Sequence, residues 1–208
     1  MTRTAPEITI RDAKPEDLAT LVDTLAEGFH DGDFADWLIP DPAQRARVYP
    51  GYFRILAGHA LNTGWVQITG DGDAVAVWHL IGPNPAVAPP IPRYQQRLAD
   101  TVGPEALPRF RALDTAMEEY HPAGPHHYLA FLAVRPDRRG QGLGTALLEH
   151  HHQYLDGRGI PAYLEATGPR NMRLYLRHGY QPRPPFRLTD GSPHALPMWR
   201  DPNPGTTG

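Results

Sequence analysis

Three glycines at alternate positions are the clearest chemical signal in the sequence. Gly140, Gly142 and Gly144 stand in the run Arg139–Thr145, directly before an apolar stretch with helical spacing. The N-terminus of a helix carries unpaired N–H groups and a partial positive charge, and glycines allow the backbone to close around an anion. The pattern therefore predicts a phosphate-binding loop that leads into a helix.

Two common types of phosphate loop do not fit this run. A Walker loop needs a lysine after its last glycine, whereas Thr145 follows Gly144. A dinucleotide-binding fingerprint has the spacing G-x-G-x-x-G directly after a strand, whereas here G-x-G-x-G follows a linker. A further alternative is a tight turn that binds no ligand.

A third type of loop fits the surrounding sequence. The run Arg139–Gly144 follows Leu132-Ala133-Val134-Arg135-Pro136, and further along the chain Asn171 precedes Leu174-Tyr175 and Gly179-Tyr180. In order and spacing these motifs resemble the GNAT superfamily of acetyl-CoA-dependent N-acetyltransferases. The resemblance extends over residues 132–180.

Other stretches resemble a narrower group. Ala74–Trp78, Tyr163–Thr167 and Pro169–Asn171 are similar to segments of the puromycin N-acetyltransferases and their actinobacterial relatives, and Pro197–Arg200 is a weaker match. Such enzymes acetylate amines of small molecules, including antibiotics. Residues 83–125 show no clear match and form a family-variable middle segment that could help to shape the acceptor pocket.

The resemblance implies how acetyl-CoA is held. Arg139 would lie near the phosphates, and the main-chain groups of Leu132 and Val134 would pair with the pantetheine arm as an added strand does. Asn171 would cap a short helix, bind CoA, or do both. The backbone amides expected to hold the pyrophosphate are those of Gly140, Gln141, Gly142, Leu143, Gly144 and Thr145.

The resemblance also implies two catalytic groups. Tyr175 matches the tyrosine that protonates the leaving thiolate, a role that suits a phenol with a pKa of about 10, although the residue could instead only pack. Glu165 is our first choice for the base that accepts the proton of the amine, because burial would raise its pKa into a useful range. Glu165 could also serve only as a hydrogen-bonding strut. The other candidate bases are Glu118, Glu119, His121 and His127.

An acidic stretch precedes the second predicted helix. Asp33 and Asp36, with Trp37 or Phe34, would receive a cationic amine, because this region borders the acceptor site in the GNAT superfamily. The alternative is a charged loop that is simply solvated.

The eleven histidines do not indicate a metal site. His150, His151 and His152 are consecutive on a predicted helix and point about 100° apart, whereas shared ligands need spacings of three or four residues. We expect His151 to pack inward and the other two to face solvent or an interface. His126 and His127 should point to opposite faces of a strand. We expect no bound metal.

Composition limits the remaining function classes. The chain has 208 residues, no cysteine and a net charge of -3. The absence of cysteine excludes thiolate metal sites and cysteine nucleophiles, so acyl transfer must be direct or use another nucleophile. Near-neutral charge argues against nucleic acid as a partner, and no apolar run or signal peptide indicates a membrane. We expect a cytoplasmic protein that acts on a small-molecule amine and could form a homodimer.

The 24 prolines divide the chain into segments. Long elements should lie in the proline-free ranges 16–39, 51–82 and 137–160, and Pro83–Pro92 should be a connector. The predicted strands are 8–10, 65–69, 74–80, 127–134, 162–166 and a closing hairpin of 181–187 with 195–200. The predicted helices are 15–25, 43–61 interrupted by Pro50, 93–119 broken near Gly103, 143–156 and 171–178.

These expectations combine into one fold and one reaction. The fold class is α/β, with a GNAT-type mixed, mostly antiparallel sheet flanked by helices and a V-shaped splay between the two central parallel strands. Residues 1–200 would form a single domain, and residues 201–208 a disordered tail. The expected reaction is direct transfer of acetyl from acetyl-CoA to a primary amine of a small molecule. The alternatives are another acyl-CoA, a peptide or amino-acid amine, or a CoA- or drug-binding module without catalysis.

Overall fold

The computed structural model describes residues 8–82, 90–203 and 205. Within these residues, no helix is both long and apolar enough to cross a membrane. The elements follow one another in the order β1 (Ile10–Asp12), η1 (Pro15–Asp17), α1 (Leu18–Gly28), α2 (Asp33–Leu38), α3 (Pro42–Thr63), β2 (Trp65–Thr69), β3 (Ala74–Ile81), α4 (Tyr94–Glu119), β4 (His126–Val134), η2 (Pro136–Arg138), α5 (Leu143–Asp156), β5 (Ala162–Ala166), α6 (Pro169–Arg177), β6 (Gln181–Pro182), β7 (Phe186–Arg187) and β8 (His194–Arg200).

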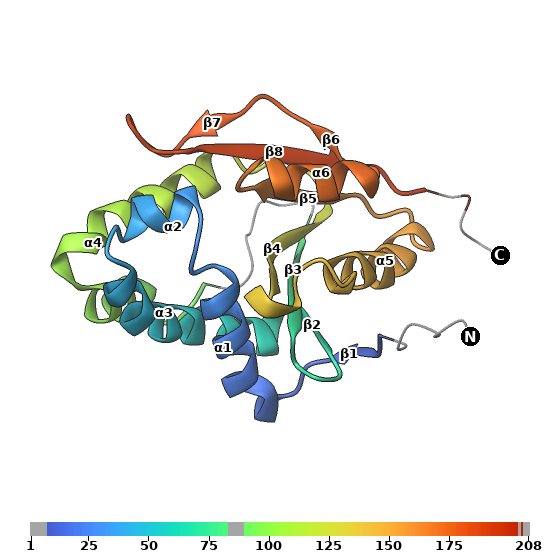
Figure 1. Cartoon of the computed structure of the whole chain (residues 1–208). Coiled ribbons are helices and arrows are strands. Elements are labelled where there is room, and N and C mark those ends of the chain that lie inside the picture. The colour runs from blue at the N-terminus through green and yellow to red at the C-terminus, as the bar shows by residue number, and fades with distance from the viewer. Residues whose placement is uncertain (1–7, 83–89, 204, 206–208) are drawn as a thin grey trace.

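A single sheet runs through the middle of the molecule, with helices on both faces (Figure 1). The strand order is β1-β2-β3-β4-β5-β8-β6, and β7 also pairs with β8. The β4–β5 pair is parallel and the other pairs are antiparallel. One apolar cluster packs α1 to α4 on one face, and a second packs α5 and α6 on the other. The predicted mixed, mostly antiparallel sheet is confirmed.

The two parallel strands separate after a short contact. Only His127 with Ala162 and Tyr128 with Tyr163 are paired, whereas β4 runs on to Val134. Just beyond this contact the register of β4 against β3 shifts, which leaves Ala130 as a bulge. A bulge bends a strand and increases its twist, so it turns β4 away from β5. The predicted V-shaped splay is therefore present, and its cause lies in β4.

Helix α1 approaches β4 unusually closely. A Cβ atom at Gly28 would lie 2.8 Å from the Cβ of Ala133, so only glycine fits at this contact. The close approach brings the end of α1 next to the segment that follows β4.

The predicted interruption of a helix at Pro50 is wrong. Helix α3 continues through Pro50 from Pro42 to Thr63. A proline inside a helix costs about 3 kcal/mol, but Tyr49, Tyr52 and Phe53 bury their rings in the core around it, and this packing offsets the cost. The predicted break near Gly103 is confirmed, because Gly103 has a φ of 75°.

The remaining elements lie close to their predicted positions. The hairpin of β2 and β3 is confirmed, and β6 and β7 both pair with β8 as the closing hairpin. The first strand is wrongly placed, since it begins at Ile10 rather than Ile8. Residues 83–89 of the predicted connector, and residues 204 and 206–208 of the predicted tail, lie outside the described residues.

Candidate functional site

The glycine-rich run forms a turn at the N-terminus of α5. Gly140 and Gly142 have φ values of 82° and 86°, which favour glycine, and Gly142 is the N-cap of the helix. The first helical bond runs from the Ala146 N–H to the Gly142 carbonyl. The amides of residues 143–145 precede that bond and have no carbonyl within the helix to donate to. This is the geometry of an anion-binding helix terminus.

The neighbouring edge of β4 has free main-chain groups. The Arg135 N–H donates to the Asp73 carbonyl on the β3 side at 2.9 Å. Because successive residues of a strand direct their polar groups to opposite sides, Val134 and Leu132 direct theirs toward β5, which has already diverged. An extended ligand arm can pair with this edge as an extra strand would.

The side chains of the turn mostly bind the protein itself. An Arg139 guanidinium nitrogen donates to the Gly28 carbonyl at 2.8 Å, and the Gln141 amide lies 3.5 Å from the Asp137 carbonyl. Leu143 is buried in the core, and a Cβ at Gly144 would lie 3.7 Å from Leu174 and Val134. Apart from the remaining guanidinium N–H groups of Arg139, the turn presents main-chain groups to a ligand.

Tyr175 is almost fully buried on α6. Its ring meets the ring of Tyr180 edge-on at 5.7 Å, and burial raises the pKa of its hydroxyl above the ordinary value. Within the described residues the hydroxyl makes no hydrogen bond. The residue thus packs in the core and also has a neutral hydroxyl that is free to donate.

Asn171 does not cap its helix. Helix α6 begins at Pro169 with Gly168 as its N-cap, and the Asn171 amide donates to the Thr167 hydroxyl at 3.1 Å. The prediction of an asparagine N-cap is wrong because proline suits the first position of a helix and starts this one two residues earlier.

Glu165 lies on the face of β5 opposite α5. Leu164 and Ala166 pack toward α5, so alternation turns Glu165 and Tyr163 toward the other face. The Oε1 atom of Glu165 and the hydroxyl of Tyr163 are both buried, and neither has a hydrogen-bond partner. Burial raises the pKa of Glu165 to about 7, while the nearby hydroxyls of Tyr163 and Tyr128 act to lower it.

Two histidine pairs lie on opposite faces of β4. The Nε2 atoms of His121 and His126 are 3.0 Å apart, and the His121 ring packs against Tyr128 and Tyr163, near Glu165. His127 lies on the other face, where its Nδ1 is 3.0 Å from the Nε2 of His151. Of the alternative bases, His121 is therefore beside the Glu165 face, whereas His127 is directed away from it.

The other candidate bases and the three consecutive histidines differ in how deeply they are buried. Glu118 and Glu119 are exposed at the end of α4. His151 packs inward and His150 is exposed, as predicted, but the prediction that His152 faces solvent or an interface is wrong. His152 is buried because its Nε2 meets the Tyr180 hydroxyl at 3.1 Å. Among the described residues, no group of three or more potential metal ligands comes together.

The three predicted acceptor residues lie in different environments on α2. Asp33 is exposed, whereas Asp36 forms an ion pair with the buried guanidinium of Arg45. Trp37 is partly buried against the apolar clusters that join α2 to α4 and to the β7–β8 end of the sheet. Asp36 is thus already neutralised by Arg45, which leaves Asp33 as the freer carboxylate.

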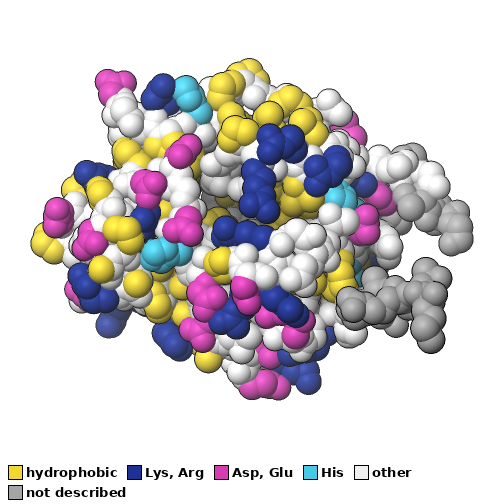
Figure 2. Space-filling model, viewed as in Figure 1, with side chains coloured by type: hydrophobic (Ala, Val, Ile, Leu, Met, Phe, Trp, Pro, Cys, Tyr) yellow, Lys and Arg dark blue, Asp and Glu magenta, His cyan; other side chains and the backbone are white. Residues whose placement is uncertain are grey.

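Charge is divided across one face of the molecule. Lys and Arg side chains gather beside the hollow of this face on the side of α6, and Asp and Glu side chains gather over the α1–α2 side (Figure 2). Arg170, Arg173 and Arg177 are exposed on α6, and within the described part of the chain no carboxylate pairs with them. Sequence reasoning missed them, although their spacing of three and four residues places them on one helical face. It also missed Tyr128 and Tyr163, whose role depends on strand pairing.

Comparison with known proteins agrees with this geometry. Residues 108–180 match the family model of the acetyltransferase (GNAT) family. The chain is similar in structure to histone acetyltransferase HPA2 and related acetyltransferase from Corynebacterium glutamicum, with 25% identity, a TM-score of 0.69, and 96% of this chain and 98% of that chain covered.

Two other solved structures share the fold at lower identity. Arylalkylamine N-acetyltransferase 2 from Aedes aegypti is 14% identical, with a TM-score of 0.60, and 95% of this chain and 100% of that chain are covered. The PaiA N-acetyltransferase from Thermoplasma acidophilum, solved in complex with coenzyme A, is also 14% identical, with a TM-score of 0.51 and coverage of 94% and 99%. The family match over residues 108–180 and the similarity to solved acetyltransferases lead to one conclusion: this chain has a GNAT-like fold.

Proposed function

We propose that this chain transfers the acetyl group of acetyl-CoA directly to a primary amine of a small molecule. The observation that carries the proposal is the opening between β4 and β5. On one side lie the unpaired edge of β4 and the free amides of α5, and on the other lies Glu165 with an unpartnered carboxylate oxygen. A donor with a phosphate end and an extended arm fits the first side, and a proton-bearing acceptor fits the second.

The residues present fit acetyl-CoA, which supplies an activated acetyl thioester when bound. The amides of Gly140–Thr145 and the field of α5 bind the pyrophosphate, with Arg139 beside it. The main-chain groups of Leu132 and Val134 align the pantetheine arm. A free N–H of this edge donates to the carbonyl oxygen of the thioester as negative charge develops on it. Asn171, which lies near the start of α6, contributes to the same binding side.

Glu165 and Tyr175 divide the proton transfers. Glu165 accepts the proton that the attacking amine must lose, and its raised pKa keeps the carboxyl near the working pH. Tyr175 donates its hydroxyl proton to the thiolate that leaves. Burial raises the pKa of Tyr175, so this hydroxyl stays protonated until the thiolate forms. Since the chain has no cysteine, no thioester on a cysteine of the enzyme is formed.

The charge division supports a cationic small molecule as the acceptor. Acidic side chains gather on the α1–α2 side of this face and basic ones on the α6 side, so an anionic donor and a cationic acceptor are drawn to different sides (Figure 2). Asp33 and Trp37 lie on α2. The resemblance to the puromycin N-acetyltransferases supports an antibiotic-like or metabolite amine. We further propose that the protein acts in the cytoplasm, where its donor is available.

The test is release of free CoA thiol with a panel of acceptors. The panel contains alkylamines, aromatic amines, an aminonucleoside antibiotic, amino acids and a short peptide, each with acetyl-CoA and with propionyl-CoA. We expect thiol release with acetyl-CoA and at least one small amine, and mass spectrometry should find the N-acetylated product. Preference for the peptide or for propionyl-CoA would favour the other acceptor or donor. Saturable CoA binding without thiol release under any condition would contradict catalysis.

A further inference from the structure

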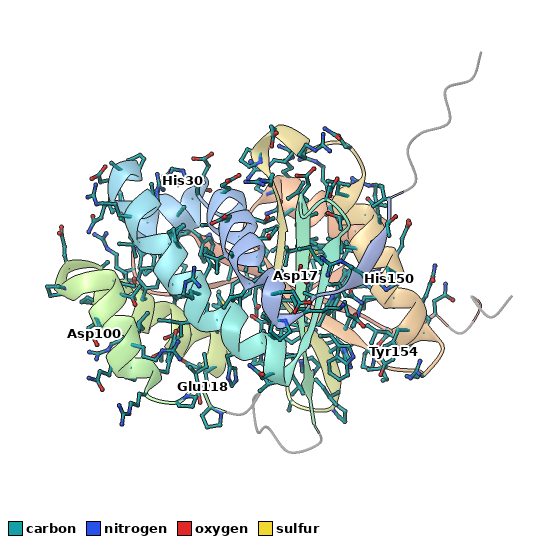
Figure 3. All side chains as sticks on the ribbon, turned by 90° about the horizontal axis from the view of Figure 1, so that it is seen from below. Asp17, His30, Asp100, Glu118, His150 and Tyr154 are labelled. Carbon is teal, nitrogen blue, oxygen red and sulfur yellow. The ribbon has the colours of Figure 1, made fainter. Side chains whose placement is uncertain are left out.

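A second concave site lies outside the opening between β4 and β5. It is a pocket of about 320 Å³ between α1 and α3, beside the start of η2. His30, at the end of α1, lines it and is labelled in Figure 3. The volume is about ten times the share of one water molecule in the liquid, which suits a small organic molecule rather than a bare ion.

A freed carbonyl lies in the wall of this pocket. Pro50 sits inside α3 and has no N–H, so the carbonyl of Ala46, four residues earlier, loses its helical donor. Both Ala46 and Pro50 line the pocket. The proline that the helix tolerates at a cost thus provides a main-chain acceptor at this site.

An unpartnered hydroxyl lies in the same wall. The Tyr49 side chain is only 3% exposed, and its ring packs edge-on against Phe53 at 5.7 Å. Tyr49 lines the pocket, and its hydroxyl makes no hydrogen bond within residues 8–82 and 90–203. The hydroxyl oxygen itself is not shut off from solvent, so it is available to a ligand as a donor or acceptor.

The opposite wall is acidic. Asp23, Glu27 and Asp31 line the pocket from α1 and the turn after it. Glu27 is engaged by Arg135, with N–O distances of 2.7 and 2.9 Å, and Asp31 accepts from His30 at 3.1 Å. Asp23 has no ion-pair partner among the described residues. The polar groups that face the pocket are therefore mostly acceptors with an excess of negative charge.

We propose that this pocket binds an organic ammonium ion. The carboxylate of Asp23 supplies the charge, and the Ala46 carbonyl and the Tyr49 hydroxyl accept two of the ammonium N–H groups. An ammonium has three donors and no acceptor, which complements this set. The ammonium can belong to the far end of a diamine acceptor or to a separate effector, and both present the same chemistry.

Binding is tested by calorimetry on the full chain without acetyl-CoA, with 1,4-diaminobutane as the probe. We expect saturable binding that weakens at least about tenfold in Asp23→Asn, which corresponds to the loss of one charged contact. Asp100→Asn is the matched control, because Asp100 lies on α4, well apart from His30 (Figure 3). Absence of saturable binding, or equal affinity in wild type and Asp23→Asn, would overturn the proposal.

Pro50→Ala tests the site with a variant that should fold at least as well as wild type. The new main-chain N–H at position 50 bonds to the Ala46 carbonyl, so we expect a higher melting temperature together with weaker diamine binding. Tyr49→Phe should weaken binding while leaving the core packing of the ring unchanged. A Pro50→Ala protein that is more stable and binds the diamine as well as wild type would exclude the carbonyl and overturn the proposed site.

Kinetics distinguish the two sources of the ammonium. If it belongs to the acceptor, 1,4-diaminobutane has a lower KM than butylamine, and Asp23→Asn removes this difference while kcat is unchanged. If it belongs to an effector, the diamine changes the rate of butylamine acetylation without itself being acetylated. Failure of all amines to release thiol would count against the proposed acetyl transfer, whereas the calorimetric result would still decide the pocket.

Discussion

Replacing Glu165 by glutamine should slow the enzyme and stabilise it at the same time. Glutamine keeps the size of the side chain and removes the base. General-base catalysis contributes about 100- to 10,000-fold, so we expect kcat to fall at least about 100-fold at pH 8. The pH profile of kcat/KM for wild type should rise about tenfold per pH unit and level off near pH 7, where the pKa of Glu165 lies, and this limb should vanish in Glu165→Gln.

The stability change follows from the same pKa. Burial raises the pKa of Glu165 from 4.5 to about 7, so the unfolded chain releases this proton more readily than the folded protein. Between pH 4.5 and 7 this group therefore destabilises the fold increasingly as the pH rises, by up to about 3 kcal/mol above pH 7. Removal of the ionisable group should raise the free energy of unfolding of Glu165→Gln above that of wild type at pH 8, but not at pH 4.5.

Two measurements check these expectations. Thiol release is followed from pH 5.5 to 9 with two amines of different pKa, because a limb that belongs to the enzyme stays near pH 7 with both. Urea denaturation at pH 4.5 and 8 gives the free energies of unfolding. Glu118→Gln, at an exposed alternative base, should behave as wild type in both assays. A Glu165→Gln enzyme with wild-type turnover and an unchanged pH profile would refute the role of Glu165 as the base.

Three further predictions concern the acid, the acceptor side and the core. Tyr175→Phe should lower kcat about 10- to 100-fold with CoA affinity nearly intact, and full turnover would exclude Tyr175 as the acid. Asp33→Asn should raise the acceptor KM more than it changes kcat, whereas Asp36→Asn should mainly lower the melting temperature, because it leaves the buried partner guanidinium unpaired; an unchanged KM in both would remove α2 from the acceptor site. Burial lowers the pKa of His127 to about 4 and of His151 to about 2, so each should cost about 1.4 kcal/mol of stability per pH unit as the pH falls from 6.5 to 4. The measurement is urea denaturation of Glu165→Gln, in which the opposing effect of Glu165 is absent, and an unchanged midpoint across this range would contradict the prediction.

Elements with a local signal were predictable from the sequence. The hairpin of β2 and β3 has a run of residues that favour strands on each side of a glycine turn, and β5 was predicted with its observed bounds. The predicted interruption at Pro50 was wrong because proline disfavours a helix locally, whereas tertiary packing of the buried rings around Pro50 stabilises the continuous helix. The prediction for His152 was wrong for a similar reason, since its partner Tyr180 is remote in sequence.

The site was only partly predictable for the same physical reason. The glycine-rich turn is formed by consecutive residues, so its motif predicts the turn and the helix start. The environment of Glu165 depends on the β4–β5 contact that brings Tyr128 beside Tyr163, and nothing in the local sequence encodes that contact. The pairing of Asp36 with Arg45 likewise joins two helices, so Asp36 looked as free as Asp33 in the sequence.

The end of α1 joins the proposed donor loop to the proposed acceptor side. Gly28 lets α1 lie directly on β4, its carbonyl accepts from Arg139 of the phosphate loop, and its neighbour Glu27 binds Arg135 at the start of that loop. The acidic turn and α2 follow immediately after these contacts. Movement of this loop on donor binding would therefore displace the segment that carries Asp33 and the wall of the proposed ammonium pocket. We expect donor occupancy and cation affinity to be coupled through these three contacts.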